Sequence, residues 1–571
     1  MTVTNTTPTA NDSHYDAVII GAGFAGLYQL YMLRDRLGLN VHLFEKGHGV
    51  GGTWYWNKYP GAMSDTESPF YRYSFDEKLL ADWEWQRKYI DQPDILAYLE
   101  ETVRRFDLAR DIELSTEVVG MAWSDHAGRW TVRTADGRTV TATYVVTALG
   151  LLSTTNWPAI PGLADFKGRL VHTAEYPADL DIKGKRVGII GTGSTGCQFI
   201  VASAPMVDKL TVFQRSPQYS VPSGNGSVDD GEVEGYKAKW GEIWPQVRSS
   251  AVAFGFEESK VPAMSVSAEE RERVFQQAWD RGNGFYYMFG TFSDIATDPE
   301  ANEAAAAFIR KKIKEAVKDP KTAERLTPRT PYAKRPLCNH EYYEVYNREN
   351  VELVSIREGD TPIERITTRG VITTDGREHE LDVLVLATGF DAVDGNYRKL
   401  DLRGREHINA HWNPAPTSYM GLMTAGFPNM FMVVGPNGPF VNIVAAIETQ
   451  VEFITRLVQA SETRGGVVEA TQEAEDAWTE TCKAIAGATL FAKEQSWIFG
   501  ANIPGKQHSV LFYLGGLKNY RDCLEASVRK EWDGFVFPRQ VAAVRSRAEA
   551  AQAESKAQEV EHIELSTARA A

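Results

Sequence analysis

The stretch Asp16–Gly26 reads DAVIIGAGFAG, and it decides the fold of this sequence. The apolar run Ala17–Ile20 predicts a short buried strand, and the residues after the glycines predict a helix to about Leu37. A second strand is expected over Val41–Phe44, directly ahead of an acid, Glu45. Strand, glycine-rich turn, helix and strand in this order are typical of a dinucleotide-binding βαβ unit.

Each glycine of GAGFAG has its own predicted role. Gly21 makes the tight turn, Gly23 lets the backbone approach a pyrophosphate, and Gly26 lets the helix pack closely on the strand. The N-terminus of the helix then faces the phosphates. Glu45 is expected to accept the ribose hydroxyl groups, which predicts a site for FAD or NAD.

The same unit recurs downstream with one informative change. A strand over Arg186–Ile190 precedes GTGSTG, in which Gly191, Gly193 and Gly196 repeat the spacing, and the next strand is expected over Leu210–Phe213. Arg215 stands where the first unit has its acid. A carboxylate binds a free ribose 2′-hydroxyl, whereas a guanidinium accommodates a 2′-phosphate, so the second unit predicts NADPH.

The order of segments predicts that the second unit is inserted in the first. Buried strands ending in small residues are expected over Tyr144–Gly150 and Leu381–Phe390, where the chain would leave the first domain and re-enter it. We therefore predict an α/β protein with two Rossmann-like domains and a helical insertion. The expected segments are a disordered N-terminus (1–14), an FAD-binding domain (15–150 and 381–541), an NADPH-binding domain (151–223 and 329–380), a helical insertion (224–328) and a C-terminal tail (542–571).

Composition limits the partners. The 571 residues include 61 Lys and Arg and 76 Asp and Glu. The resulting net charge of -15 argues against nucleic acid and anionic membranes as partners. No apolar run is long enough to span a bilayer and the N-terminus has no signal-peptide pattern, so a cytoplasmic protein is expected. The four cysteines, Cys197, Cys338, Cys482 and Cys523, form no CxxC and no metal-ligand spacing, which predicts reduced thiols and no metal site.

A flavin beside a nicotinamide implies hydride transfer to the flavin, after which the electrons pass to a disulfide, a redox protein or dioxygen. The disulfide route lacks a cysteine pair. The stretch FKGRLVHTAEYP ahead of the second unit resembles the fingerprint of class B flavin-dependent monooxygenases, FxGxxxHxxxW followed by Pro or Asp. Phe166, Gly168, His172 and Pro177 fit, but Tyr176 replaces the Trp of the Baeyer-Villiger enzymes. Since Tyr at this position resembles the N- and S-oxidising enzymes, the motif alone leaves both groups open.

Longer strings favour one group. Several strings together resemble the cyclohexanone monooxygenase group of Baeyer-Villiger enzymes, among them GGTWYWNKYPGAMSDTE, YAKRPLC, ATGFDAVDGNY and SWIFGANIPGK. The similarity runs from about Tyr15 to about Pro538. Given this resemblance, we interpret Tyr176 as a tolerated replacement of the usual Trp. A heteroatom monooxygenase and an NADPH-dependent flavoprotein reductase are the alternatives.

The resemblance implies a reaction. NADPH reduces FAD, dioxygen adds at flavin C4a, and the peroxide attacks the carbonyl of a small, cyclic ketone. A carbon then migrates to oxygen and yields a lactone or ester. The partners implied are the ketone and O2, and the protein is expected to be a monomer or weak oligomer.

The resemblance also implies roles for single residues. Arg335 occupies the catalytic arginine position, where a cation that keeps its proton is required, and Asp65 pairs with it. Lys334 and Arg215 resemble the pair that clamps the 2′-phosphate, and Trp497 resembles a residue that closes over NADP+ in a mobile loop near 490–507. His172 is assigned to domain coupling and not to proton transfer.

The resemblance implies contacts for further residues as well. Residues near the second nucleotide are Ser194, Thr195 and Ser216. Residues expected to contact the flavin cofactor are Phe24, Thr53, Trp54, Met63, Ser64, Tyr71 and Val118. Residues expected to shape an apolar substrate pocket are Leu151, Leu152, Phe254, Phe285, Phe440 and Phe512.

Overall fold

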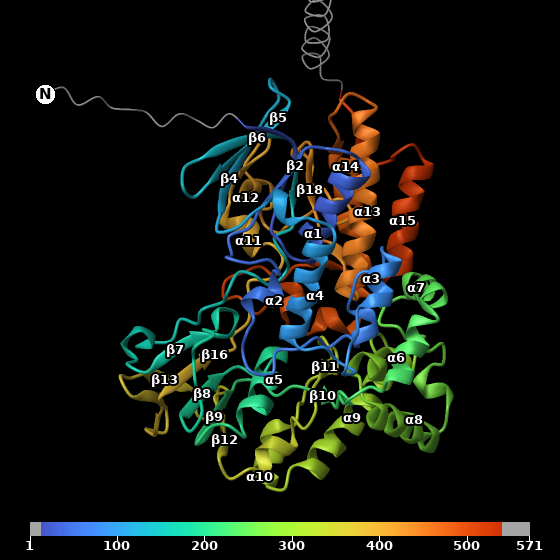
Figure 1. The fold of residues 1–571 in the computed structure, drawn as a ribbon. Helices are drawn as coiled ribbons and strands as arrows, with labels where there is room; N and C mark the ends of the chain where they lie inside the picture. The colour runs from blue at the N-terminus through green and yellow to red at the C-terminus, as the bar shows by residue number, and fades with distance from the viewer. Residues whose placement is uncertain (1–12, 539–571) are drawn as a thin grey trace, which may run out of the picture.

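Two sheets organise the computed structural model, which describes residues 13–538. They lie one above the other in Figure 1. The upper sheet has the strand order β17-β4-β5-β6-β1-β2-β3, with β18 also paired to β6. Its strands are β1 (His14–Ile20), β2 (Val41–Phe44), β3 (Ile112–Glu113), β4 (Val118–Ser124), β5 (Arg129–Thr134), β6 (Thr139–Thr147), β17 (Asp401–Arg403) and β18 (Met430–Met432). Only β4, β5 and β6 pair antiparallel among the strands of this sheet, and β1 lies parallel between β6 and β2.

The lower sheet is entirely parallel, with the order β12-β9-β8-β16-β7. Its strands are β7 (Arg169–His172), β8 (Arg186–Ile190), β9 (Lys209–Gln214), β12 (Val351–Ser355) and β16 (Val383–Leu386). An antiparallel sheet of β13 (Ile363–Ile366), β14 (Gly370–Thr373) and β15 (Glu378–Glu380) follows β12 along the chain. Both parallel strand–helix–strand units predicted from the glycine motifs are therefore present.

All five strands of the lower sheet fall between β6 and β17 in the chain, so the second nucleotide fold is inserted in the first. The predicted re-entry at Leu381 is wrong, because β16 pairs with β7 and β8 of the lower sheet. The chain returns to the upper sheet only at β17. A run of Val and Leu suits the centre of any parallel sheet, so the sequence does not say which sheet the strand joins.

Helices replace strands over residues 224–328, as predicted, and form the green to yellow-green region from the lower right to the bottom centre of Figure 1. They are α6 (Asp230–Lys237), α7 (Trp240–Ser249), α8 (Ala268–Arg281), α9 (Pro299–Ala316) and α10 (Pro320–Leu326). Side-chain N-caps start several of them; for example, Asp298 accepts from two backbone N–H groups at the start of α9. The insertion thus forms one side of the molecule, beside the lower sheet.

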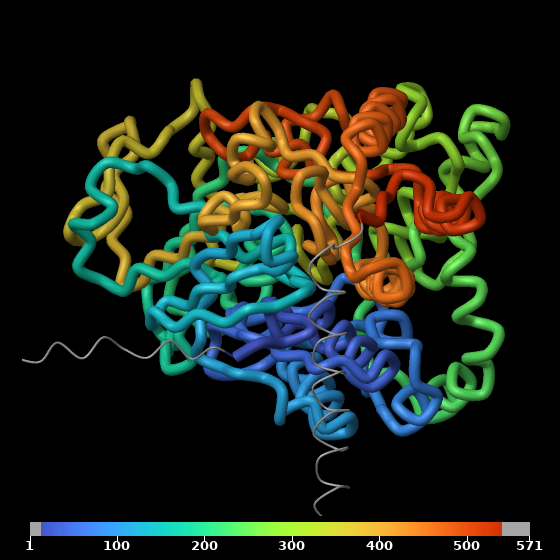
Figure 2. The backbone as a smooth tube through the Cα atoms, turned by 90° about the horizontal axis from the view of Figure 1, so that it is seen from above, coloured from blue at the N-terminus to red at the C-terminus, as the bar shows by residue number. Residues whose placement is uncertain are grey.

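The remaining helices belong mostly to the first nucleotide fold. Two long helices, α13 and α15, flank the upper sheet in Figures 1 and 2, and α13 packs directly on α1. The helices are α1 (Phe24–Tyr31), α2 (Thr53–Trp56), α3 (Glu77–Asp82), α4 (Gln92–Arg105), α5 (Ser194–Ser203, in the lower fold), α11 (Gly395–Lys399), α12 (Ile408–His411), α13 (Ile443–Glu462), α14 (Gln472–Gly487) and α15 (Leu517–Arg529). Three short pairs complete the strands: β10 (Ser220–Val221) with β11 (Leu337–Cys338), β19 (Gly438–Pro439) with β21 (Phe512–Tyr513), and β20 (Glu469–Ala470) with β22 (Phe535–Val536).

The ends of the chain lie partly outside the described residues. The predicted disordered N-terminus falls there up to residue 12, but His14 already belongs to β1, so the boundary at 14 is too late. The predicted tail over 542–571 lies wholly outside. Within 13–538, no helix is long and apolar enough to cross a membrane. All four cysteines are free thiols.

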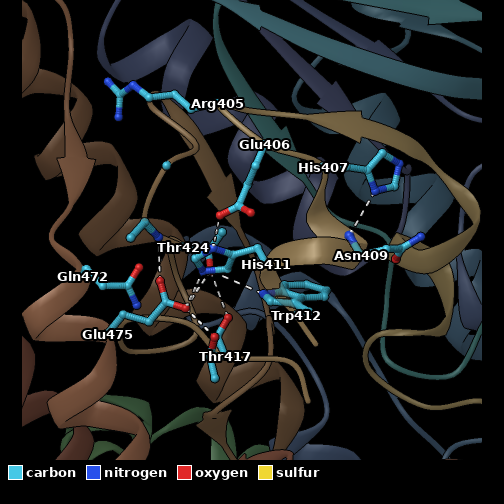
Figure 3. A network of polar contacts seen from close by, with 12 residues as sticks. Arg405, Glu406, His407, Asn409, His411, Trp412, Thr417, Thr424, Gln472 and Glu475 are labelled. Atoms are coloured by element: carbon cyan, nitrogen blue, oxygen red, sulfur yellow. Dashed lines mark hydrogen bonds and ion pairs between the residues drawn. The ribbon is translucent and has the colours of Figure 1, made fainter. Parts of the chain in front are cut away.

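A buried polar network fixes the start of α14, the helix that leads to the Trp497 segment (Figure 3). Glu475 is fully buried and accepts hydrogen bonds from His411 Nε2 at 3.0 Å and the Ala425 N–H at 2.6 Å. The hydroxyl groups of Thr417 and Thr424 also donate to it. The hydrogen-bonding capacity of the buried Glu475 carboxylate is thus used by four donors, which hold the start of α14 against the segment from His411 to Ala425.

Candidate active site between the two nucleotide folds

The first glycine turn is as tight as predicted. Gly21 has φ +105°, a backbone conformation that side chains disfavour, and a Cβ on Gly26 would lie 1.8 Å from the Gly21 carbonyl oxygen. Helix α1 begins at Phe24, directly after Gly23. The first N–H groups of this helix have no partner within the helix and lie next to glycine backbone that carries no side chain, an arrangement suited to a pyrophosphate.

Glu45 directly follows β2, beside this turn. Its carboxylate accepts from the backbone N–H groups of Ala22 at 2.8 Å and Gly47 at 2.7 Å, and the residue is 5% exposed. An open groove of about 570 Å³ begins next to it, lined by Lys46, Trp56, Ser115, Thr116, Glu117, Ala135 and Asp136. An acidic residue beside a phosphate-type turn, with the next residue, Lys46, lining an open groove, fits the adenosine part of FAD.

The second glycine turn has the same geometry. Gly191 has φ +111°, and a Cβ on Gly196 would lie 2.3 Å from its carbonyl oxygen. A Cβ on Gly193, by contrast, would meet no atom within 4 Å. The turn is tied to the end of β9 by a hydrogen bond from Thr192 Oγ1 to the Ser216 carbonyl at 3.2 Å. Ser194 and Thr195 open α5 beside this turn.

The cations predicted for the 2′-phosphate lie near the second turn. Arg215 directly follows β9 and is exposed. Lys334 lines a narrow cavity together with Pro217, Gln218, Tyr219, Thr330, Pro331, Tyr332 and Arg335. The Glu494 carboxylate lies 3.7 Å from Lys334 Nζ. Glu494 was not predicted from the sequence, because no spacing or motif relates it to a lysine so far away in the chain.

Residues 59–65, which belong to the first nucleotide fold, contact the second fold. Tyr59 Oη donates to Gln198 Oε1 at 2.7 Å, and Gln198 Nε2 donates to the Met63 carbonyl at 3.0 Å. Ser64 closes the segment by donating to the Thr66 carbonyl at 3.1 Å. Because Gln198 belongs to α5, this contact holds the segment against the second nucleotide helix. Sequence reasoning missed Tyr59 and Gln198, since neither residue type carries a motif.

Asp65 extends from this segment to Arg335. Asp65 Oδ2 and Arg335 Nη1 form an ion pair, and the two side chains are 16% and 25% exposed. The guanidinium carbon also lies 5.0 Å from the centre of the Phe285 ring. Burial acts to lower the pKa of Arg335, but the charge and hydrogen bond of Asp65 outweigh it and the pKa is raised. Arg335 therefore keeps its proton.

The predicted flavin-contacting aromatic residues form one cluster beside α1. Trp54 Nε1 donates to Tyr71 Oη at 3.0 Å, and the Phe24 ring meets Tyr71 edge-on at 5.5 Å. Burial raises the pKa of Tyr71. Thr53 is exposed at the start of α2. Val118 differs: it is buried in the core of the upper sheet, within the same hydrophobic cluster as Phe44.

The predicted substrate-pocket residues form two aromatic groups. Phe254 stacks on Phe285 at 4.1 Å. Phe440 lies 5.1 Å from Phe512 and 6.1 Å from Trp497. The two groups are joined through Asn442, whose side-chain amide donates to the Ala253 carbonyl at 3.0 Å. Leu151 and Leu152 pack, partly buried, against the hydrophobic cluster that also contacts Phe440 and Trp497.

The family follows from comparison with known proteins. A model described as flavin-binding monooxygenase-like matches residues 15–221. A "Baeyer-Villiger monooxygenase" of Pseudooceanicola batsensis is 54% identical over 92% of this chain and 96% of its own length. The chain belongs to the flavin-binding monooxygenase-like family. A "Phenazine N-monooxygenase" of Lysobacter antibioticus is 53% identical, over 92% of this chain and 97% of its own.

Solved structures place this flavin-binding monooxygenase in the same fold. The crystal structure of cyclohexanone monooxygenase from Rhodococcus sp. Phi1 bound to NADP+ has a TM-score of 0.92 and 56% identity, over 93% of this chain and 100% of that one. The mixed α/β fold with two nucleotide units is thus the family's fold.

The fingerprint of this flavin-binding monooxygenase runs through the edge strand β7, which ends at His172, and through the turns on either side of it. A Cβ on Gly168 would lie 2.5 Å from the Asp382 carbonyl oxygen and 2.6 Å from the Phe166 ring, so only glycine fits there. His172 is 1% exposed, accepts from the Ala174 N–H at 3.2 Å, and has a pKa lowered by burial. This environment supports a scaffold role.

Tyr176 and Pro177 follow the short turn after β7. Tyr176 is buried against Phe199 of α5, and its hydroxyl has no hydrogen-bond partner within the described part of the chain. The Pro177 carbonyl accepts from the Leu180 N–H at 3.2 Å. The aromatic ring at position 176 therefore packs on the helix of the second nucleotide turn, a role for which its polar group is not needed.

Proposed function

We propose that this protein is an FAD- and NADPH-dependent monooxygenase of the Baeyer-Villiger type, which converts small cyclic ketones to lactones with dioxygen. The observation that carries the proposal is the Arg335–Asp65 pair, a permanent cation held between two dinucleotide folds and against the ring of Phe285. The similarity to cyclohexanone monooxygenase supports the same reaction.

The cofactors have residues to hold them. The first turn, with Gly21, Gly23, Gly26 and Glu45, would hold FAD, and the second turn, with Arg215 and Lys334, would hold NADPH. When bound, the flavin activates dioxygen with electrons that NADPH supplies. The protein then has to position the ketone, stabilise negative charge on oxygen and exclude water.

Arg335 would stabilise the negative charge that develops on oxygen as the ketone carbonyl is attacked. Because Asp65 raises the pKa of Arg335, the guanidinium does not donate a proton that would neutralise the attacking oxygen. Asp65 also fixes the orientation of the guanidinium. The rings of Phe285, Phe440 and Phe512 offer an apolar wall for the hydrocarbon part of the ketone and keep water away.

A second function, N-oxygenation of an aromatic amine-type ring, is favoured by two observations. The phenazine N-monooxygenase is 53% identical to this chain, and Tyr176 departs from the Trp of the Baeyer-Villiger fingerprint. A permanent cation beside the reacting oxygen suits ketone oxidation better than N-oxygenation. The adduct formed at the ketone carbonyl carries a negative charge, whereas N-oxygenation develops no negative charge on the substrate.

The test is product analysis with both substrate classes. The purified protein, supplied with FAD and NADPH, is expected to form caprolactone from cyclohexanone and little N-oxide from phenazine. N-oxide without lactone would establish the second function instead. A cytoplasmic location and a monomeric or weakly oligomeric state stay predictions from the sequence.

A further inference from the structure

The segment that carries Asp65 holds a second acid, Glu67, which faces the helical insertion. Glu67 is 8% exposed and directly precedes a short turn over Ser68–Phe70. Whereas Asp65 pairs with Arg335, Glu67 Oε1 accepts a hydrogen bond from Asn283 Nδ2 at 2.9 Å. The proposed chemistry gives this buried acid no role, and no motif in the sequence marks it.

Asn283 holds the start of the helical turn that carries Phe285. It is fully buried, and its Oδ1 accepts from the backbone N–H groups of Phe285 at 3.0 Å and Tyr286 at 3.1 Å. Its own backbone N–H donates to the Pro222 carbonyl at 2.9 Å. The φ of Asn283 is +84°, in a region that Gly and Asn tolerate best. The side chain therefore caps the turn from a fixed piece of backbone.

Glu67 determines which way the Asn283 amide points. An asparagine side chain has an oxygen that only accepts hydrogen bonds and a nitrogen that only donates them. Because the nitrogen donates to the Glu67 carboxylate, the oxygen faces the two N–H groups of the turn. Without this acceptor a buried amide N–H loses its partner, and nothing holds the cap in this orientation.

Lys88 balances the charge of Glu67. Its Nζ lies 3.8 Å from Glu67 Oε1 and donates to the Arg281 carbonyl, at the end of α8, at 3.1 Å. The side chains of the lysine and the acid are 23% and 10% exposed, so water screens the pair only in part. Lys88 belongs to the first nucleotide fold and Arg281 to the insertion. The acid, the lysine and the amide thus join these two parts directly beside Phe285.

The Phe285 ring lies against both the cation and the apolar wall of the site. The Arg335 guanidinium carbon is 5.0 Å from the centre of this ring, and Phe254 stacks on it at 4.1 Å. A Cβ on Gly284 would lie 2.6 Å from the Leu337 carbonyl oxygen, so the turn also packs closely on the segment after Arg335. These contacts remain when the Glu67 hydrogen bond is lost. The expected result is therefore a displaced ring and not a released segment.

We propose that Glu67 is a positioning residue that acts through Asn283 to place the Phe285 ring beside Arg335 and so sets the size of the ketone. A displaced ring widens the space beside the cation and loses contact with a small substrate, so larger cyclic ketones gain relative to small ones. The inference rests on the proposed function, because the ring selects a ketone only if Arg335 receives one. Asp65 orients the cation, and Glu67, from the same segment, orients the ring against it.

Steady-state kinetics on the FAD-loaded protein tests the proposal with two ketones. In Glu67→Leu, the ratio of kcat/KM for cyclohexanone to kcat/KM for cyclooctanone should fall roughly tenfold, at the lower end of what an apolar pocket discriminates. Flavin reduction by NADPH should stay within about twofold. Glu67→Gln keeps an acceptor for Asn283 and should keep the ratio of the wild type. An unchanged ratio in Glu67→Leu, or an equal fall in both variants, would overturn the proposal.

Further variants test whether Glu67 acts through Asn283. Asn283→Gly removes the cap without straining the backbone, since glycine adopts φ +84° freely. It should shift the ratio in the same direction, and adding Glu67→Leu should shift it no further. Glu84→Leu is the matched control, because it removes another acid of the first fold that pairs with a lysine of the insertion, Lys237. It should keep the ratio, and additive effects of the other two changes would contradict the coupling.

Hydrogen–deuterium exchange separates this proposal from the proposed function. The N–H groups of Phe285 and Tyr286 donate to Asn283, so Glu67→Leu should raise their exchange roughly tenfold, as for loss of one hydrogen bond, and Glu67→Gln should not. Unchanged exchange in Glu67→Leu would show that the acid does not hold the cap, even where the wild type forms lactones. Raised exchange in a protein whose wild type forms no lactone from either ketone would refute the proposed function, and the specificity role with it.

Discussion

Arg335 is the residue on which the proposed chemistry depends most directly, since it combines a permanent charge with an ion pair across the two folds. Arg335→Ala should leave flavin reduction by NADPH within about twofold of the wild type but lower lactone formation by at least roughly 100-fold, as for loss of an oxyanion-stabilising group. Gas chromatography of the lactone and a stopped-flow trace of flavin reduction measure the two steps. Arg329→Ala, at an exposed arginine, is the control. Undiminished lactone would remove Arg335 from its role.

Arg215 tests the nucleotide preference at the same scale. It is exposed after β9, where a 2′-phosphate would arrive. Arg215→Ala should cost a charged hydrogen bond worth about 1.5–3 kcal/mol and so raise the KM for NADPH roughly 10- to 100-fold. The KM for NADH should change little. Steady-state kinetics with both nucleotides decides this, and equal losses for both would show that Arg215 does not read the phosphate.

Among the elements, the second glycine turn offers a matched pair of substitutions. A Cβ on Gly196 would lie 2.3 Å from the Gly191 carbonyl oxygen, whereas one on Gly193 would meet open space. Gly196→Ala should therefore lower the melting temperature by several degrees, the effect of about 1–3 kcal/mol of overpacking. Gly193→Ala should fold normally and weaken NADPH binding only. Calorimetric melting and equilibrium binding measure both, and the reverse pattern would refute the assignment of the turn.

The network at the start of α14 predicts a pH dependence of stability. Burial acts to lower the pKa of His411, but the hydrogen bonds and charges of Glu475 and Glu406 raise it to about 9. A histidine whose pKa is higher folded than unfolded stabilises the protein fully below pH 6.5, its ordinary value, and loses this contribution as the pH rises through about 9.

His411→Gln removes the titrating group shown in Figure 3. The melting temperature of the wild type should therefore fall more steeply between pH 6.5 and 9 than that of the variant. Scanning calorimetry across this range makes the comparison. Parallel curves for the two proteins would show that His411 carries no linked charge.

On the scale of the whole molecule, the sequence predicted the architecture because glycine spacing and apolar runs are local signals. The strands at Val41–Phe44 and Arg186–Ile190 have the predicted bounds, and the insertion of one nucleotide fold in the other follows from their order. The re-entry at Leu381 was wrong because pairing of a buried strand is a tertiary choice. The run VLVL fits both sheets equally well.

The site was predicted in parts. Arg335 and Asp65 were paired by resemblance, and the structure brings them into contact. The contacts of Gln198 with Tyr59, and of Glu494 with Lys334, join segments far apart in the chain. No periodicity or motif marks such residues, so only the folded arrangement identifies them. Val118 differs from these residues, because it was expected by resemblance to contact the flavin and lies in the hydrophobic core of the upper sheet. Its apolar side chain on a strand is sufficient reason for that burial.

The most direct test of the account uses purified protein with FAD, NADPH, cyclohexanone and isotopically labelled dioxygen. We expect caprolactone that carries one labelled oxygen atom, formed in step with NADPH consumption. Consumption of NADPH with the ketone unchanged, while phenazine takes up the label as an N-oxide, would contradict the central claim.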